Sequence, residues 1–392
     1  MNLLRNKRFN SVALGHLYVD TLNGLRSVVF AYISGILGLS NSVLGIISTV
    51  YIIVSNLIQP IFGYLADKIG PKSMVAGGVI WMASFFTLSA MTQGFTSIIL
   101  LIVASIGSGV FHPAGTNQAT IEGKKFLSGR ETTALSFFVL FGGTGGFIGP
   151  ILSGSLLNKW GLNGLIGLGI IGIPIGFYAM HCLPSKNDYL KDQNKEEKPI
   201  RISYNKKLLT GILVVVAFIA AFQAWINNTL LTFLPKYMSD FGADATEYGL
   251  FVSIYAICAT IGNLIGGNIA DSIGKHRVVM ASMILSIMPL SYIVLNGYSN
   301  WFYLIIPLAG FFVGAGYSSI VVIAQRVIPT GPALATGIIL SFIFTSGALG
   351  TMASGYIADI FGYSTMFLIC VILALFAGIL TLLLNNKKEV VY

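Results

Sequence analysis

Long apolar segments alternate with short polar or glycine-containing breaks along the whole chain. A helix needs about 20 predominantly apolar residues to cross a bilayer, and twelve segments meet that requirement. They lie at about 10–37, 43–66, 73–92, 96–120, 131–158, 162–183, 207–236, 246–270, 277–296, 300–325, 333–358 and 363–384. The pattern therefore predicts an all-α membrane protein with twelve transmembrane helices.

One long polar insertion, SKNDYLKDQNKEEKPIRISYNKK at 185–207, divides these segments six and six. Its composition is too polar to bury a core, so we expect a solvated segment. The predicted organisation is an N-terminal six-helix bundle over 1–184, a cytoplasmic linker over 185–206 and a C-terminal six-helix bundle over 207–392.

The charge distribution predicts how the chain lies in the bilayer. Only 9% of the residues are charged and 55% are hydrophobic, whereas about 25% are charged in soluble domains. With a cytoplasmic N-terminus, twenty of the 23 lysines and arginines fall on the cytoplasmic side, Lys159 and Lys236 fall outside, and Arg26 lies within a span. The positive-inside rule thus predicts a cell-membrane protein with both termini cytoplasmic. The net charge of +9 follows from this topology and indicates no nucleic-acid partner.

Several classes of chemistry are absent from the pattern. The three cysteines lie in apolar segments, and the four histidines show no metal-ligand spacing. No nucleotide-binding loop is present. We therefore expect no enzyme activity, no cofactor and no metal. A passive channel would not need the internal repeat described next.

The two halves of the chain repeat each other. GYLADKIGPK at 63–72 recurs as GNIADSIGKHR at 267–277, and GGFIGPILSGSLLNKWG at 145–161 recurs as SGALGTMASGYIADIFG at 346–362. Weak symmetry between six-helix halves is typical of secondary transporters.

The first repeated motif resembles the signature loop of the major facilitator superfamily. The resemblance covers essentially the whole chain and implies two bundles that alternate in exposing a central site. We expect a gate and hinge at the motif, because its glycines allow helices to approach and its charges sit at cytoplasmic helix ends. The predicted gate residues are Gly63, Asp67, Lys68, Gly267 and Asp271.

Gly149 and Pro150 belong to a stretch that resembles the G-x-x-x-G-P-x-x-[SG]-G element of the superfamily's antiporter branch. A proline kink beside closely packed glycines would let this helix bend between inward and outward states. A purely structural glycine seam explains the same residues.

A narrower resemblance is carried by GHLYVDTLNG at 15–24, QPIFGYLADK at 59–68 and VFHPAG at 110–115. Together they resemble the fosmidomycin-resistance type of major facilitator exporter, which has H-x-x-x-D in its first helix and F-H-P in its fourth. Ala114 stands where that type is expected to have an acidic residue. The resemblance thus implies proton machinery more than a particular drug.

Asp20 is the one acidic residue predicted to lie deep in the membrane. Placed about 6 Å to the cytoplasmic side of the midplane, it matches the predicted depth of His112 in the fourth span, and in the family fold both helices line the central cavity. A charge at that depth is costly unless it is paired, hydrated or neutralised. We expect Asp20 and His112 to carry protons and His16, one turn away, to orient Asp20. A static network that stabilises the bundle is the alternative.

Arg26 keeps its charge under all physiological conditions and lies about 120° around the helix from Asp20. We expect it to bind an anionic group of the substrate, such as a phosphonate or carboxylate. Pairing with backbone carbonyls, or with a carboxylate through water, is the alternative.

The second half lacks these charges, because Asp20 aligns with Ala224 and Arg26 with Leu230. It offers amides and an aromatic ring instead, and we expect substrate contacts there, although Trp225 is equally well explained by packing. The predicted substrate-binding residues, besides Arg26, are Asn23, Gln223, Trp225, Asn227 and Asn228.

These observations predict a monomeric, proton-coupled exporter that binds a small polar or anionic organic compound and protons within the lipid bilayer. An importer of an organic anion or other small metabolite, or a lipid or peptide transporter of the same fold, remains an alternative.

Overall fold

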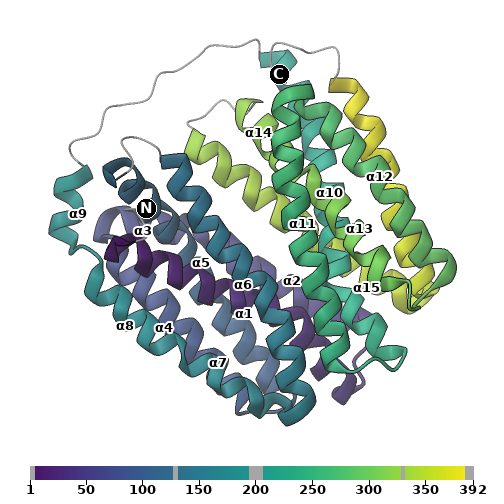
Figure 1. Ribbon diagram of the computed structural model, residues 1–392, viewed down its shortest axis with the longest axis horizontal. Helices are drawn as coiled ribbons and strands as arrows, with labels where there is room; N and C mark the ends of the chain where they lie inside the picture. Colours follow the sequence, from purple (N-terminus) through teal and green to yellow (C-terminus); the bar gives the residue numbers. More distant parts are fainter. Residues whose placement is uncertain (1–4, 127–130, 194–205, 328–331, 385–392) are drawn as a thin grey trace. The chain divides into compact units, whose positions relative to one another are not determined.

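The computed structural model describes residues 5–126, 131–193, 206–327 and 332–384, and these form helices and turns without a strand (Figure 1). The predicted spans are recognisable in their order. Three of them, the second, sixth and tenth, are each divided into shorter helices.

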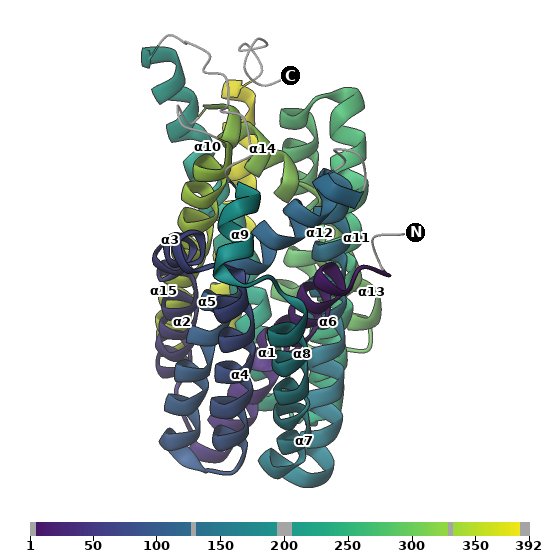
Figure 2. The ribbon, with the colours of Figure 1, turned by 90° about the vertical axis from the view of Figure 1, so that its left-hand side faces the viewer.

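The first six spans begin with one long helix and end with three short ones. They are α1 (Lys7–Leu37), α2 (Asn41–Leu57) with α3 (Gln59–Ile69), α4 (Pro71–Ala90), α5 (Gly94–Phe126), α6 (Glu131–Trp160), and η2 (Gly161–Leu165) with α7 (Ile166–Ile170) and α8 (Gly172–Cys182). The break between α2 and α3 precedes Pro60, which has no N–H to continue the helix. Helix α4 packs against both α5 and α8 (Figure 2).

The last six spans are α10 (Lys206–Asp240), α11 (Ala245–Ile273), α12 (Lys275–Asn296), α13 (Phe302–Ala315) with α14 (Tyr317–Val327), and α15 (Pro332–Leu380) followed by η3 (Thr381–Leu384). Helix α15 holds two spans, because Gly362 takes a φ of 82° and turns the chain. Helices α10 and α12 pack against α15.

Length and hydropathy mark nine stretches of the described chain as able to cross a membrane. Two of them, of 46 and 47 residues, are each long enough for two crossings. Helix α1 has 31 residues and is also long enough to cross. It is not among the nine stretches, because its polar residues lower its hydropathy. The prediction of an all-α membrane protein with twelve transmembrane helices is confirmed.

The chain forms two compact units. The first contains Met1–Ile33, Val50–Glu197 and Asp244–Ser253, and the second contains Ser34–Thr49, Lys198–Ala243 and Ile254–Tyr392. Each unit thus holds most of one predicted bundle together with a short segment from the other half of the chain. The predicted boundaries at 184 and 207 stay a prediction.

The beginning of α2 belongs to the second unit because a carboxylate of α15 caps it. The backbone N–H groups of Asn41 and Ser42 donate to the two oxygens of Asp359, at 2.8 and 2.7 Å. The Tyr363 hydroxyl donates to Asn41 Oδ1 at 2.7 Å. An acidic side chain at a helix N-terminus satisfies N–H groups that have no partner within the helix.

Part of the predicted solvated linker is a helix. Helix α9 (Lys186–Gln193) begins after Ser185, whose side chain and that of Asp188 hydrogen-bond at 2.6 Å. Tyr189 anchors α9, since its hydroxyl accepts from Asn117 Nδ2 at 2.8 Å and only 2% of the residue is exposed. The average polarity of the linker concealed this one buried aromatic residue. Residues 194–205 lie outside the described part of the chain.

Candidate functional site

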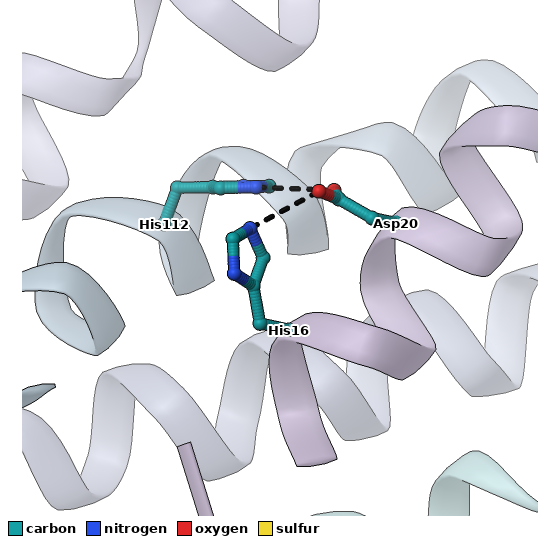
Figure 3. Close-up of side chains that lie close together, drawn as sticks. All are labelled: His16, Asp20 and His112. Atoms are coloured by element: carbon teal, nitrogen blue, oxygen red, sulfur yellow. Dashed lines mark ion pairs between the residues drawn. The ribbon is translucent and has the colours of Figure 1, made fainter. Parts of the chain in front are cut away.

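Asp20 lies between two histidines in the first unit. Its Oδ2 is 3.0 Å from His16 Nε2, one turn earlier on α1, and its Oδ1 is 3.2 Å from His112 Nε2 on α5. Figure 3 shows both imidazole rings directed at the single carboxylate. The structure therefore brings together the three residues that the sequence analysis named for proton coupling.

The remaining nitrogens of the two imidazoles are held by backbone carbonyls. His16 Nδ1 lies 2.7 Å from the Phe138 carbonyl oxygen, and His112 Nδ1 lies 2.8 Å from that of Ser108. A carbonyl oxygen can only accept, so each Nδ1 carries a hydrogen. In a neutral imidazole the Nε2 would then be an acceptor, facing a carboxylate oxygen that is also an acceptor.

Each of the two nitrogen–oxygen contacts consequently needs a proton of its own. With both protons present the three groups carry a formal charge of +1, from two imidazolium ions and one carboxylate or an equivalent distribution. Loss of one proton leaves two acceptors facing each other at about hydrogen-bond distance, which is unfavourable. The geometry is suited to a site that takes up and releases protons as its surroundings change.

A row of glycines on α6 makes room for this cluster. A Cβ at Gly142 would lie 2.5 Å from His16 Nε2 and 2.6 Å from Asp20 Oδ2. One turn on, a Cβ at Gly145 would meet the backbone of α1 at Leu17 and Thr21, and Gly149 would do the same at Thr21. Close approach of α6 thus requires glycine along this face, which favours the structural interpretation of Gly149 in the predicted antiporter element. Pro150 follows within the same helix.

Water has access to one side of the cluster in the first unit. The side chains of Asp20 and His112 are 25% and 23% exposed, whereas that of His16 is 8% exposed. His16 is enclosed by the Phe138 ring, stacked at a centroid distance of 4.0 Å, and by Phe111. Protons can reach the Asp20–His112 pair more directly than they can reach His16.

Asn23 extends the cluster along α1. Its Nδ2 donates to Asp20 Oδ1 at 3.1 Å and to Ser108 Oγ at 2.9 Å, and its Oδ1 accepts from the Tyr51 hydroxyl at 3.0 Å. These bonds use both ends of the amide. Asn23 was predicted to contact substrate, but in this structure it holds the carboxylate of Asp20.

Arg26 lies beside the same network. Its guanidinium carbon is 5.0 Å from the centroid of the Tyr51 ring, within the range of a cation–π contact. Among the described residues no carboxylate forms a salt bridge with it. Arg26 thus forms no direct pair with Asp20 among the described residues, as their separation around the helix predicts, and the guanidinium retains donors for an anion. Pairing with backbone carbonyls, or with a carboxylate through water, stays an alternative.

The two histidines and the aspartate are also residue types that bind transition metals, and their ligand atoms lie within 4.8 Å of one another. Spacing along the sequence does not indicate this grouping, because the ligands come from two helices far apart in the chain. The contacts that they make have the length of hydrogen bonds, so we interpret the cluster through its protons.

The predicted substrate residues of the second half are engaged within the second unit. Gln223, 3% exposed, donates to the Val313 carbonyl at 3.1 Å. Trp225 donates to Ser354 Oγ at 2.8 Å and packs on Gly350. These contacts favour the packing interpretation of Trp225.

Two asparagines of α10 are similarly occupied. Asn227 accepts from the Tyr255 hydroxyl at 3.0 Å, and Asn228 packs against Gly347 of α15. Both remain partly exposed.

The predicted gate residues lie in α3 and in the last two turns of α11. A Cβ at Gly63 would be 3.4 Å from Pro113, and Lys68 Nζ lies 4.5 Å from the Tyr64 ring centroid. Close approach of a neighbouring helix does not explain Gly267, because no atom of the described residues lies within 4 Å of its Cβ position. The adjacent residue, Gly266, is the one that contacts a neighbouring helix, at Ala315. The side chains of Asp67 and Asp271 lie outside the described residues.

Sequence reasoning missed Tyr51 and Ser108, which complete the network around Asp20. Neither belongs to a motif, and each is a common residue type in an apolar span. A signal for Tyr51 did exist: the offset of the internal repeat pairs it with Tyr255, as it pairs Asn23 with Asn227.

Comparison with known proteins points to a transporter family. The profile of the Major Facilitator Superfamily matches residues 12–237 and 213–391. The fosmidomycin resistance protein of Escherichia coli (strain K12) is 25% identical over 384 residues, covering 97% of this chain and 93% of that protein. The narrower resemblance to the fosmidomycin-resistance type is confirmed.

Solved structures share the fold. A bacterial homologue of the human lysosomal transporter Spinster, in an inward-facing and occupied conformation, matches with a TM-score of 0.74 at 15% identity, covering 98% of this chain and 97% of the other. A mutant of the nucleoside transporter NupG matches with a TM-score of 0.74 at 15% identity, covering 97% and 100%. At this identity the likeness concerns the fold alone.

Proposed function

This chain belongs to the Major Facilitator Superfamily, and from that premise we propose that it is a proton-coupled exporter of a small polar or anionic organic compound. It is a multi-pass membrane transporter and not an enzyme. In the proposal it works as a monomer by alternating access in the cell membrane, with both termini cytoplasmic, and exchanges its substrate for protons.

The two-proton geometry at Asp20 is the observation that carries the proposal. Two imidazoles with fixed Nδ1–H groups face one carboxylate at 3.0 and 3.2 Å. The proton population of such a group responds to hydration and to nearby charge, both of which change when a transporter opens to the other side. A static ion pair would be expected to be shielded from water, but Asp20 is a quarter exposed.

Arg26 supports an anionic group on the substrate. It is a permanent charge in an apolar span, and its recorded contact among the described residues is the face of the Tyr51 ring. A guanidinium in this position favours a planar anion that accepts two hydrogen bonds, such as a carboxylate or phosphonate.

The direction of transport rests on the relatives, which include proteins named for resistance to fosmidomycin and to multiple drugs. Proton-coupled import of an organic anion is the second candidate, and one observation favours it. Arg26 and Asp20 are connected through Tyr51 and Asn23, so an anion at Arg26 would attract protons to Asp20 and the two would move together. In an exchanger, by contrast, binding of one disfavours binding of the other.

Binding measured at several pH values distinguishes these possibilities. Purified protein is titrated with a panel of small organic anions that includes fosmidomycin, and thermal stabilisation reports binding. An exporter that exchanges protons binds its substrate more weakly at low pH, and an importer binds more tightly. Affinity that is independent of pH, both in the wild type and in Asp20→Asn, would overturn proton coupling at this site.

A further inference from the structure

The same tyrosine–asparagine pair occurs in both halves of the chain. Tyr51 donates to Asn23 Oδ1 at 3.0 Å, and Tyr255 donates to Asn227 Oδ1 at 3.0 Å, and in each case the partners are 28 positions apart in the chain. The two pairs are related by the offset that relates the signature loops at 63–72 and 267–277. The pair is therefore part of the repeated architecture.

The surroundings of the two pairs differ. At the position of Asp20 the second half has Ala224, 3% exposed, and at the position of Arg26 it has Leu230, which is fully buried. In the first unit the pair thus joins a carboxylate to a guanidinium. In the second unit it has apolar residues at both positions and can only brace the helices.

Tyr51 fixes the orientation of the Asn23 amide. Because the Tyr51 hydroxyl is the donor to Oδ1, Nδ2 must face Asp20 and Ser108, to which it donates. Tyr51 is only 3% exposed, so water cannot readily replace its hydroxyl. The other end of this chain of contacts is the Tyr51 ring, on which Arg26 rests at 5.0 Å.

We propose that Tyr51 and Asn23 are positioning residues that connect the binding of an anion at Arg26 to the protonation of Asp20. An anion that draws Arg26 off the Tyr51 ring leaves Tyr51 free to move. The Asn23 amide then loses its fixed orientation. As a result Asp20 loses a hydrogen-bond donor that stabilises its ionised form. The carboxyl then holds its proton more tightly. By linkage, protonation of Asp20 raises the affinity of Arg26 for the anion by the same factor as the anion raises the proton affinity of Asp20. This inference rests on the part of the proposed function in which Asp20 takes up and releases protons. Its sign, with anion and proton favouring each other, is that of the second candidate, proton-coupled import.

Few other charged groups of the described residues lie near this connection. The groups that face Asp20 are His16 from its own helix and His112 from α5, with Arg26 reaching it through Tyr51 of α2. Helix α6 packs against Asp20 with Gly142, which has no side chain. The test therefore needs to follow only the aspartate and its two histidines.

The experiment needs no substrate. The protein contains four histidines, so nuclear magnetic resonance of ¹⁵N-histidine in lipid nanodiscs can follow His112, identified by the signal lost in His112→Gln. Tyr51→Phe is compared with Tyr255→Phe, which removes the equivalent hydrogen bond from the second unit. We expect Tyr51→Phe to move the His112 titration midpoint by about one pH unit, and Tyr255→Phe to leave it unchanged.

A double-mutant cycle then tests the connection itself. Arg26→Gln imitates the neutralisation that a bound anion provides, and it should move the midpoint in the wild-type background but by less than half as much when Tyr51 is replaced by Phe. Combined with Tyr255→Phe, its effect should be undiminished. Additive effects of Arg26→Gln and Tyr51→Phe would mean that Arg26 acts directly through space, and would overturn the proposal, as would equal behaviour of the two tyrosine variants.

Folding and transport are controlled separately. If Tyr51→Phe does not fold, Asn23→Leu removes the same connection with a side chain of similar size and must likewise reduce the response to Arg26→Gln to less than half. A wild-type protein whose transport ignores pH would refute the proposed function. That outcome would not decide whether Arg26 and Asp20 are connected through Tyr51, because the double-mutant cycle tests the connection separately.

Discussion

Gly142 offers the sharpest test of the proton cluster, because it lies on a different helix and contributes no polar group. In Gly142→Ala the new methyl group would lie 2.5 Å from His16 Nε2 and 2.6 Å from Asp20 Oδ2. Ordinary contacts begin at 3.4 Å, so these atoms must move by nearly 1 Å. The His16–Asp20 contact of 3.0 Å would then exceed hydrogen-bond length.

A hydrogen bond to a charged group contributes about 1.5–3 kcal/mol, which corresponds to a shift of about one to two pH units. We expect Gly142→Ala to move the pH profile of transport in proteoliposomes by that amount, with gel filtration used to verify that the variant is folded. Gly146→Ala on the same helix is the matched control, because no neighbouring atom of the described residues lies within 4 Å of its Cβ position. If both variants keep the wild-type profile, the His16–Asp20 contact has no part in coupling.

Asp20→Asn should abolish proton-driven transport while the protein still folds, as judged by gel filtration, and loss of folded protein would instead support a static network. Arg26→Gln should weaken binding of an anionic ligand by roughly tenfold to a hundredfold, and Arg26→Lys by less; an equal loss for a neutral analogue would assign Arg26 to packing. Asp359→Ala should lower the stability of the second unit by about 1 kcal/mol through loss of the α2 cap, seen as a lower unfolding temperature, and an unchanged temperature would show that the cap contributes nothing. A cysteine at Gln193 should react with reagents only from the cytoplasmic side and one at Ala243 only from outside, and the reverse would overturn the topology.

The arrangement of spans was accessible from the sequence because lipid imposes a length on every apolar segment. What composition could not supply was local chemistry. Tyr189 anchors part of a linker that is polar on average, and Pro60 directly follows a break between helices that hydropathy does not reveal.

The pairing of Asp20 with His112 could be predicted from depth, since two helices of opposite direction placed both residues on the same side of the midplane. The carbonyl contacts that fix the imidazoles could not, because they depend on the rotation of α5 and α6 about their own axes. Hydrogen-bond partners were equally inaccessible for Asn23, whose amide faces Asp20. Gln223 was assigned to substrate by residue type, and only packing reveals that its amide is bonded to α13.

Proton movement driven by substrate tests the central claim most directly. Wild-type protein is reconstituted into vesicles that contain a pH-sensitive dye, and a gradient of fosmidomycin, or of an anion that stabilises the protein in the binding panel, is imposed without a pH gradient. The account predicts that protons move opposite to the substrate in the wild type and do not move in Asp20→Asn. Protons that travel with the substrate would contradict export by exchange, and substrate flux without proton movement would contradict proton coupling altogether.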